Sequence, residues 1–435
     1  MKKILRKKSG CICYNKSLFI IYMSSEELGI KLPKPYKQGE KIIKKFDKLN
    51  ENGKKILSSF LGYKEIETMF YLYLFKKYKS DCFIYCDDPE FRLLGLNFNV
   101  MSKVSKAKKE LFDNHIDTVA DAFVNCLDRN FKTLVIPITV YDNKNVNHSN
   151  LLIYRRKFNQ FEHFEPHGAY YMTVKKDAVK IKKPVQAFVD KVNVILQNKG
   201  IQKINYIQSE EVCPAIEGLQ ALEAESDLKT SDIEDIGYCS SWNMFFTELC
   251  LSNPNIESSK LLEIVFEYFK DKEHIANYLR KVIRGYAIFI DEKVNKYLSA
   301  IMGQKITATK INKMHEDAVN NSEKIQQINS AIIELLKFET YMIINKDFNI
   351  NDELKHIKNE LKGNKGDINL LVKKKVLENY EDFNKFTPLS SNLSSNLSTS
   401  TKLKSPNSLT RKMSNKTSSG DKKKSSHKNN TTKKL

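Results

Sequence analysis

The fold is decided by residues 237–250, which read GYCSSWNMFFTELC. Large apolar residues recur in this stretch at helical spacing, at Trp242, Phe245, Phe246 and Leu249. The spacing predicts a helix with one buried face, and Cys239 lies at its start, just after a glycine. Unpaired N–H groups and the helix dipole favour a thiolate at that end, as in many reactive cysteines. Free cysteine is also a common core residue, and this second interpretation is the better one for Cys250.

The residues before this helix predict an α+β domain. Runs of apolar and β-branched residues predict four strands, at residues 132–140, 151–154, 161–164 and 201–207. A polar turn over 157–160 joins the second and third strands into a β-hairpin. Pro137 in the first run permits an edge position in the sheet. A helix over 185–197 completes the domain, which we expect to be of the mixed α+β class.

The two ends of this hairpin supply a candidate base and a candidate acid. His148 opens one predicted strand and Glu165 closes the next, so the hairpin brings them to the same end. A nucleophilic cysteine needs such a base, and a third group must orient the base. The rival histidines are His163 and His167. Their spacing places them on one side of a strand, but Pro166 excludes a helical His-x3-His metal site and no third ligand is evident.

A thiol that attacks a carbonyl group also needs donors for the developing oxyanion. Gln220 is the candidate side-chain donor, and the backbone N–H of Cys239 is the second. Taken alone, Gln220 is better explained as a surface amide. Between Pro214 and Tyr238 the chain carries seven acidic residues and one lysine. Such a loop would attract a basic substrate segment or oppose a thiolate, and a solvated loop is the simpler interpretation.

Composition excludes several classes of protein. The 435 residues are 41% hydrophobic and 29% charged, so we expect most of the chain to fold. We find no apolar run of the roughly 20 residues that a membrane span needs, and no signal peptide. Eight cysteines are too few for a disulfide scaffold, so we expect reduced thiols and no structural zinc. A cytoplasmic protein is expected, in the host cytoplasm or the virion if the chain is viral, and no metal or organic cofactor is implied.

Most of the formal net charge of +20 lies at the two ends of the chain. Residues 1–22 carry six basic residues and no acidic one, and residues 388–435 carry eleven basic residues and one acidic one. The nearly balanced remainder argues against a dedicated basic groove for nucleic acid. We expect the two tails either to contact polyanions weakly and nonspecifically or to be merely solvated.

Changes in composition along the chain indicate how it is organised. Five parts are predicted: a poorly ordered basic leader over 1–30, a helical region over 31–130, an α+β core over 131–256, a helical region over 257–387, and a disordered Ser/Asn/Lys tail over 388–435. Long amphipathic stretches predict the helices that follow the core, either as a bundle or as an appendage.

These features together resemble a known group of cysteine peptidases. The order His148, Glu165, Gln220, Cys239 is similar to that of the clan containing the SUMO/ubiquitin-like-protein-specific proteases and the adenovirus proteinase. Sequence blocks that resemble poorly characterised proteins of large DNA viruses are NHSNLLIY at 147–154, FEPHG at 164–168, GYCSSW at 237–242 and LSNP at 251–254. The resemblance covers roughly residues 130–256. It implies a papain-like fold, with a mixed sheet beside the helix that bears the nucleophile.

The resemblance implies a thiol protease that hydrolyses a peptide or isopeptide bond, in a viral polyprotein or a ubiquitin-like conjugate. The chain departs from the pattern of the SUMO proteases at three points. Glu165 stands where Asp is usual, Gln220 lies nineteen residues before the nucleophile instead of a few, and Tyr238 and Ser240 flank it in place of Asp and Gly. Bacterial acetyltransferases of similar triad order use Glu. Two alternatives stay open: an acyltransferase with the same triad, and a nonenzymatic viral structural or interaction protein.

Overall fold

The computed structural model describes most of the chain between residues 62 and 385. The described ranges are 62–80, 82–86, 91–100, 105–129, 131–141, 148–169, 176–213, 217–226, 238–270, 274–344 and 348–385. The predicted leader over 1–30 and the predicted tail over 388–435 lie outside the described residues, as does most of the acidic stretch before Tyr238.

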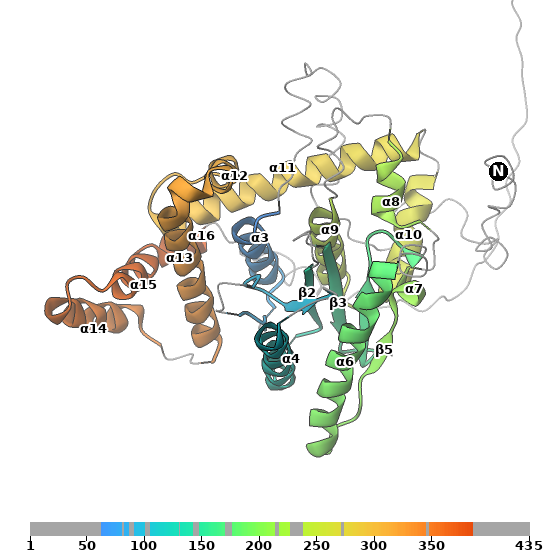
Figure 1. Ribbon diagram of the computed structural model, residues 1–435, viewed down its shortest axis with the longest axis horizontal. Coiled ribbons are helices and arrows are strands. Elements are labelled where there is room, and N and C mark those ends of the chain that lie inside the picture. The colour runs from blue at the N-terminus through green and yellow to red at the C-terminus, as the bar shows by residue number, and fades with distance from the viewer. Residues whose placement is uncertain are drawn as a thin grey trace, which may run out of the picture. The chain divides into compact units, whose positions relative to one another are not determined.

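A five-stranded mixed sheet lies at the centre of the α+β region (Figure 1). In spatial order its strands are β1 (Leu96–Asn99), β2 (Thr133–Tyr141), β3 (His148–Arg155), β4 (Gln160–Phe164) and β5 (Asn205–Ile207). Strands β2, β3 and β4 are antiparallel, whereas β1 and β5 pair in parallel at the two edges. The predicted hairpin is confirmed, and its turn holds Asn159 in the left-handed region that asparagine tolerates, with a φ of 49°.

The Pro137 strand does not take the edge position that its proline permits, because β1 pairs with the second half of β2. This strand was not predicted, since only four residues form it. The pairing begins at Leu96 opposite Ile138, one residue beyond Pro137, so the residue without an N–H lies outside that ladder. Gly95 lies against the Pro137 carbonyl, where a Cβ atom would come within 2.0 Å of the oxygen. Only glycine permits this close approach.

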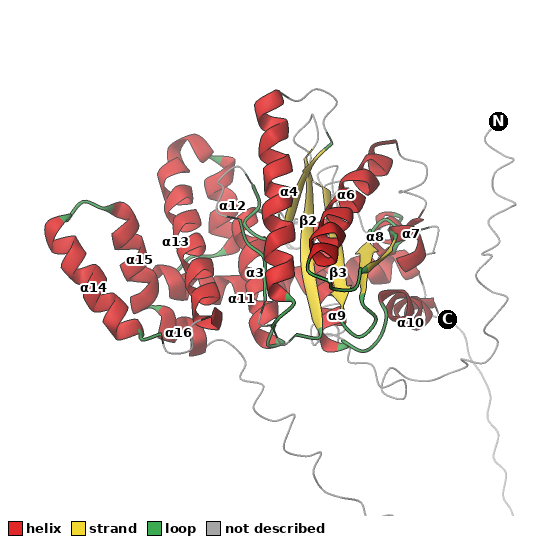
Figure 2. Cartoon of the chain, turned by 90° about the horizontal axis from the view of Figure 1, so that it is seen from below, coloured by secondary structure: helices red, strands yellow, loops and turns green. Residues whose placement is uncertain are grey.

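Two long helices, α4 (Lys106–Cys126) and α6 (Lys176–Asn198), cover one face of the sheet (Figure 2). Their apolar residues form one core with alternate side chains of β2, β3 and β4. The helix predicted over 185–197 is part of α6, which begins earlier and contains Pro184. The end of α4 is tied to the segment before β1 by a disulfide between Cys82 and Cys126, whose Cα atoms are 5.8 Å apart. The prediction that all thiols are reduced is wrong for this pair.

Helix α9 (Cys239–Ser252) covers the opposite face of the sheet and begins at the predicted residue. The ring of Phe246 stacks on that of Phe164 from β4, with centroids 4.1 Å apart. The surrounding helices are α3 (Lys64–Lys77), α10 (Ser258–Lys270) and α11 (Ile275–Met302). Because these helices pack on α9 from the side away from the sheet, every residue from Ser240 to Leu251 is buried. The prediction of a single buried face is therefore wrong.

The helical region predicted after the core is confirmed. Its further helices are α12 (Ala308–Glu316), α13 (Ala318–Ile344), α14 (Ile350–Gly363), α15 (Ile368–Glu378) and α16 (Tyr380–Lys385). The apolar core around α9 continues into these helices, and Lys76 at the end of α3 forms an ion pair with Glu339 on α13. The boundaries predicted at 131 and 257 thus fall inside connected structure, because β1 and α4 belong to the sheet layers and α9 shares its core with α11. Among the described helices, none is long and apolar enough to span a membrane.

Candidate active site

Cys239 lies at the start of α9, next to the start of β3. The N-cap residue Tyr238 makes no side-chain capping bond, so the first backbone N–H groups of the helix have no capping side chain. The thiol is half-buried, and the backbone N–H of Ser149 lowers its pKa. Negative charge on this sulfur is therefore favoured by a direct donor and by the helix dipole.

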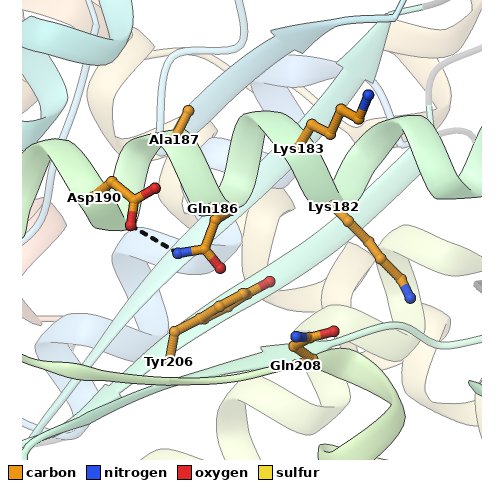
Figure 3. Close-up of a pocket in the computed structure, with 7 residues that line it drawn as sticks. All are labelled: Lys182, Lys183, Gln186, Ala187, Asp190, Tyr206 and Gln208. Carbon is orange, nitrogen blue, oxygen red and sulfur yellow. Dashed lines mark hydrogen bonds between the residues drawn. The ribbon is translucent and has the colours of Figure 1, made fainter.

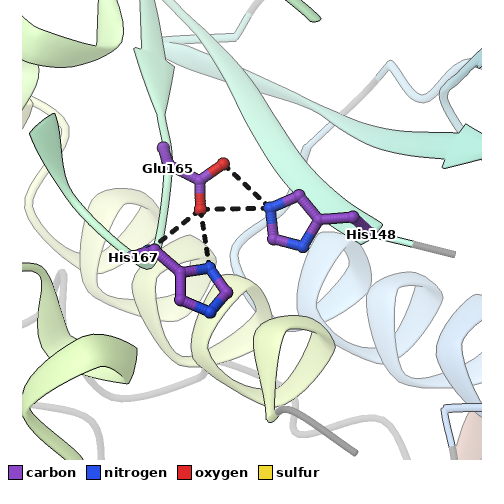
Figure 4. A group of neighbouring side chains, drawn as sticks. All are labelled: His148, Glu165 and His167. Atoms are coloured by element: carbon purple, nitrogen blue, oxygen red, sulfur yellow. Dashed lines mark hydrogen bonds and ion pairs between the residues drawn. The ribbon is translucent and has the colours of Figure 1, made fainter. Parts of the chain in front are cut away.

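His148 lies between this thiol and a carboxylate. It opens β3 opposite Val140 of β2, and its side chain is 15% exposed. Its Nε2 atom lies 2.9 Å from Oε2 and 3.1 Å from Oε1 of Glu165 (Figure 4). The Cys239 thiol lies close enough to the same ring that each of the two groups shifts the pKa of the other. Because the carboxylate holds Nε2, Nδ1 is the ring nitrogen that remains for the sulfur.

Glu165 follows the last residue of β4 and is fully buried. It begins a tight turn in which the Gly168 N–H donates to the Glu165 carbonyl over 3.0 Å. The φ of Gly168 is 85°, and a Cβ atom there would lie 2.3 Å from the nitrogen of Gly218. The backbone N–H of His167 donates to Oε1 of Glu165 over 2.9 Å. The backbone of the turn therefore holds the Glu165 carboxylate in an orientation in which it contacts His148.

Charges in this group shift one another's pKa values. Burial alone would raise the pKa of Glu165, but His148 and His167 hold it well below the usual range. Burial disfavours a charged His148, yet the Glu165 carboxylate and the Cys239 sulfur keep the pKa of the imidazole well above its ordinary value. Burial would likewise raise the pKa of Cys239, but His148 and the Ser149 N–H lower it. These directions favour a thiolate beside an imidazolium.

Gln220 lies close to the turn that carries Glu165. It belongs to α8 (Leu219–Ala224), and its backbone N–H donates to the Pro166 carbonyl over 2.9 Å. The Gln220 side chain is buried, which excludes the surface-amide interpretation, and its Oε1 has no hydrogen-bond partner among the described residues. A role for its amide as oxyanion donor to a substrate at Cys239 stays a prediction.

The rival histidine His163 is a buried structural residue. Its Nδ1 lies 3.0 Å from the Tyr206 hydroxyl and its Nε2 lies 3.0 Å from Oδ1 of Asn150. Burial lowers the pKa of His163 to about 4, so the ring is neutral at physiological pH. In that state Nε2 donates to Asn150 and Nδ1 accepts from Tyr206.

The turn after β4 and the start of β3 also bring together residues of the types that bind metals. They are not the His163 and His167 pair considered from the sequence. His148, Glu165 and His167 each offer a ligand atom, and these atoms all lie within 4.8 Å of one another (Figure 4). Nδ1 of His167 is 3.2 Å from Oε1 of Glu165. Of the sequence pair only His167 belongs to this set, and folding brings His148 and Glu165 to it.

A contact beside the thiol, between Ser240 and Glu67, could not be predicted from the sequence. The hydroxyl of Ser240, the residue after Cys239, donates to Oε1 of Glu67 on α3 over 2.7 Å. The other carboxylate oxygen of Glu67 is 3.2 Å from the guanidinium of Arg92. Ser240 could have been noticed from its position, but Glu67 precedes it by 173 residues and no local pattern connects them.

A second feature near the sheet edge is a shallow pocket of about 350 Å³ between α6 and the segment that contains β5 (Figure 3). Its lining includes Lys182, Asp190 and Tyr206, and Gln186 donates to Asp190 over 2.8 Å within it. Tyr206 connects the pocket to His163. Lys182 is paired with Glu210, so the pocket presents no unbalanced charge from that lysine.

Comparisons with known proteins leave the family of the chain open. No family model matches it, and no solved structure matches it. It is similar to a protein of Acanthamoeba polyphaga mimivirus named "Putative ankyrin repeat protein L371", at 23% identity over 284 residues. The match covers 59% of this chain and 34% of that protein, so the chain spans about a third of the length of this relative.

Proposed function

We propose that the chain is a thiol hydrolase that cleaves a peptide or isopeptide bond, with a papain-like arrangement of helix and sheet. The observation that carries the proposal is the position of the His148 ring, which is hydrogen-bonded to Glu165 and lies close enough to Cys239 to lower the pKa of the thiol. Nucleophile, base and orienting acid in this order are the components of a catalytic triad. The mixed sheet with α9 against it supports the same interpretation.

The chemistry follows from the proton positions. Nε2–H of His148 donates to Glu165, and Nδ1 takes the proton of Cys239. The thiolate adds to the substrate carbonyl carbon, and the resulting oxyanion is bound by the N–H of Cys239 and, as predicted, the amide of Gln220. His148 then returns the proton to the departing amine. Water, deprotonated by His148, hydrolyses the thioester and releases the acid and the free thiol.

The first test is labelling of each cysteine by iodoacetamide at pH 6, read by peptide mass spectrometry. An ordinary thiol, with a pKa of about 8.5, reacts slowly at this pH, whereas a thiol paired with an imidazolium keeps its thiolate. We expect fast labelling of Cys239 in the wild type and at least tenfold slower labelling in His148→Ala. The matched control is His356→Ala, because His356 lies on α14 with its side chain 66% exposed.

The second test concerns hydrolysis itself. Wild-type chain and Cys239→Ser are incubated with host-cell and viral proteins, and new protein termini and newly freed lysine amines are identified by mass spectrometry. Products that depend on Cys239 support the hydrolase, and transfer of an acyl group to lysine instead indicates the acyltransferase. Slow labelling of Cys239 at pH 6, equal to that of Cys250, contradicts the proposal.

That contradicting outcome would favour a protein-interaction role. The mimivirus relative is named for ankyrin repeats, and such a name fits a protein that binds other proteins. The predicted basic tails, with their weak contacts to polyanions, belong to the same alternative. A protein substrate and a binding partner are therefore distinguished by whether Cys239→Ser abolishes an effect or leaves it unchanged.

A further inference from the structure

The three ligand atoms around Glu165 form a compact set. Nε2 of His148 and Nδ1 of His167 lie 2.9 Å and 3.2 Å from oxygens of the same carboxylate. All three residues come from one short stretch of sheet, the start of β3 and the turn after β4. The side chain of His167 is 26% exposed and that of His148 is 15% exposed, so solvent reaches the histidine side of the set.

We propose that His148, Glu165 and His167 bind a Zn²⁺ ion, in a state that excludes thiol chemistry at Cys239. Two imidazole nitrogens and one carboxylate oxygen are a common ligand set for zinc, with water in the fourth position. Bonds of about 2.0–2.1 Å in a tetrahedral site separate ligand atoms by about 3.3 Å. The nitrogen–oxygen distances here need to lengthen by only a few tenths of an ångström.

The surroundings hold these ligands in place without the metal. The backbone N–H of His167 donates to Oε1 of Glu165, which orients the carboxylate, and the Gly168 N–H closes the turn beneath it. Hydrogen bonds of this kind to ligating groups fix their orientation and raise metal affinity. The neighbouring histidine His163 is held by Asn150 and Tyr206 and does not belong to the set.

Metal binding and thiol catalysis need opposite tautomers of His148. In the triad, Nε2 carries the proton and Nδ1 accepts the proton of Cys239. A zinc ion on Nε2 needs the lone pair of that atom, so the imidazolium of the ion pair with Cys239 releases its Nε2 proton to solvent, and the neutral ring keeps its other proton on Nδ1. His148 then has no lone pair for the thiol. Zinc and proton abstraction from Cys239 are therefore mutually exclusive, and this part of the inference rests on the proposed function.

The test measures zinc binding first, without reference to activity. Zn²⁺ is titrated by calorimetry into the full chain carrying Cys239→Ser, which cannot perform thiol chemistry. One high-affinity ion is expected, and His167→Gln in the same background should weaken its affinity at least tenfold. His356→Gln, at an exposed histidine of α14, is the matched control and should change nothing. Thermal unfolding checks that His167→Gln is folded, which its partial exposure favours.

The second measurement keeps the inference falsifiable if that variant is damaged. Co²⁺ in place of Zn²⁺ in the wild-type chain should give a tetrahedral spectrum without a sulfur-to-metal charge-transfer band. Such a band, loss of zinc binding in Cys239→Ser, or unchanged affinity in His167→Gln would each overturn the site. If zinc binds as expected but does not slow iodoacetamide labelling of Cys239 at pH 6, the exclusion is overturned while the metal site stands.

Discussion

The two ends of α9 are built alike, but the pKa values of their cysteines are shifted in opposite directions. Each end has a cysteine of the helix, a basic residue of β3 and a glutamate of β4 or the residue after it. At the first end these are Cys239, His148 and Glu165, and at the second end Cys250, Arg155 and Glu162. Both glutamates are buried. The comparison therefore separates the effect of burial from that of the charged partner.

At the second end, each of the three guanidinium nitrogens of Arg155 has a hydrogen-bond partner. The Nε of Arg155 lies 3.2 Å from Glu162, its Nη1 donates to the carbonyls of Cys250 and Asn253 over 3.2 Å each, and its Nη2 donates to Ser258 over 3.3 Å. Burial raises the pKa of Cys250 to about 11 in spite of the nearby arginine. An arginine cannot accept a proton and here closes the end of a helix, so this end is structural.

At the first end the cation is a histidine that can exchange a proton with the thiol. It is partly exposed, and the pKa of Cys239 is lowered although burial opposes this. Burial by itself therefore does not decide the direction in which the pKa of a cysteine shifts. What decides it is whether the neighbouring base can take the proton and whether a donor faces the sulfur.

The largest expected effect is on stability, at the arginine end. Arg155→Met leaves the buried Glu162 without its partner and two backbone carbonyls without a donor, so we expect a loss of about 3–5 kcal/mol in the free energy of unfolding. Urea denaturation measures it, with Lys157→Met in the exposed hairpin turn as a control that changes stability by less than about 0.5 kcal/mol. His148→Ala should cost less, because His167 still donates to Glu165. A loss under about 1 kcal/mol for Arg155→Met would contradict the structural role assigned to Arg155.

The next effect concerns the two thiols in one experiment. Cys250, with a pKa near 11, has almost no thiolate at pH 8, whereas the lowered pKa of Cys239 means that its thiolate persists as the pH falls below 9. We expect iodoacetamide to label Cys239 at least about 100-fold faster at pH 8, which corresponds to about 2.7 kcal/mol. Between pH 8 and pH 6 the rate at Cys239 should fall less than that of a small free thiol. Equal rates at the two cysteines would break the comparison.

The third effect tests the turn that carries Glu165. Gly168→Ala places a Cβ against Gly218 at a φ of 85°, so we expect a loss of about 2 kcal/mol in stability and slower labelling of Cys239 at pH 6. Gly200→Ala is the matched control, since its φ is 70° but no atom lies within 4 Å of the added Cβ. It should cost about 1 kcal/mol and leave the labelling unchanged. Equal effects of the two substitutions would show that the contact with Gly218 does not matter.

The smallest effect sharpens the separation of the two ends. The Ser258 hydroxyl contacts Glu162 and Arg155, so Ser258→Ala should lower the free energy of unfolding by about 1 kcal/mol. Labelling of Cys239 should stay at the wild-type rate, because Ser258, the first residue of α10, contacts the opposite end of α9. Thermal or urea unfolding gives the first quantity and peptide mass spectrometry the second. A slower Cys239 would mean that the two ends are coupled through the helix.

Local patterns were sufficient for the parts of this fold that depend on neighbouring residues. The hairpin follows from two runs of strand-forming residues joined by a polar turn, and its antiparallel pairing brings His148 close to Glu165. The start of α9 at Cys239 follows from the helical spacing of the apolar residues after it. β1 was missed because four residues carry too little periodicity. The one-faced interpretation of α9 failed because the helices that cover its other side lie far away in the sequence.

The sequence by itself determined the residue types of the candidate site and the order in which the chain presents them, because strand alternation and helix spacing are local properties. Only the tertiary structure decided that Cys239 meets the ring of His148, that His167 instead of His163 shares Glu165, and that Cys82 pairs with Cys126. Cys239 and His148, like Cys82 and Cys126, come from segments far apart in the sequence, so no local pattern predicts that they meet. They meet because α9 packs on one face of the sheet and α4 on the other. Glu165 and His167 are only two residues apart, and the conformation of their turn decides that His167 contacts the carboxylate.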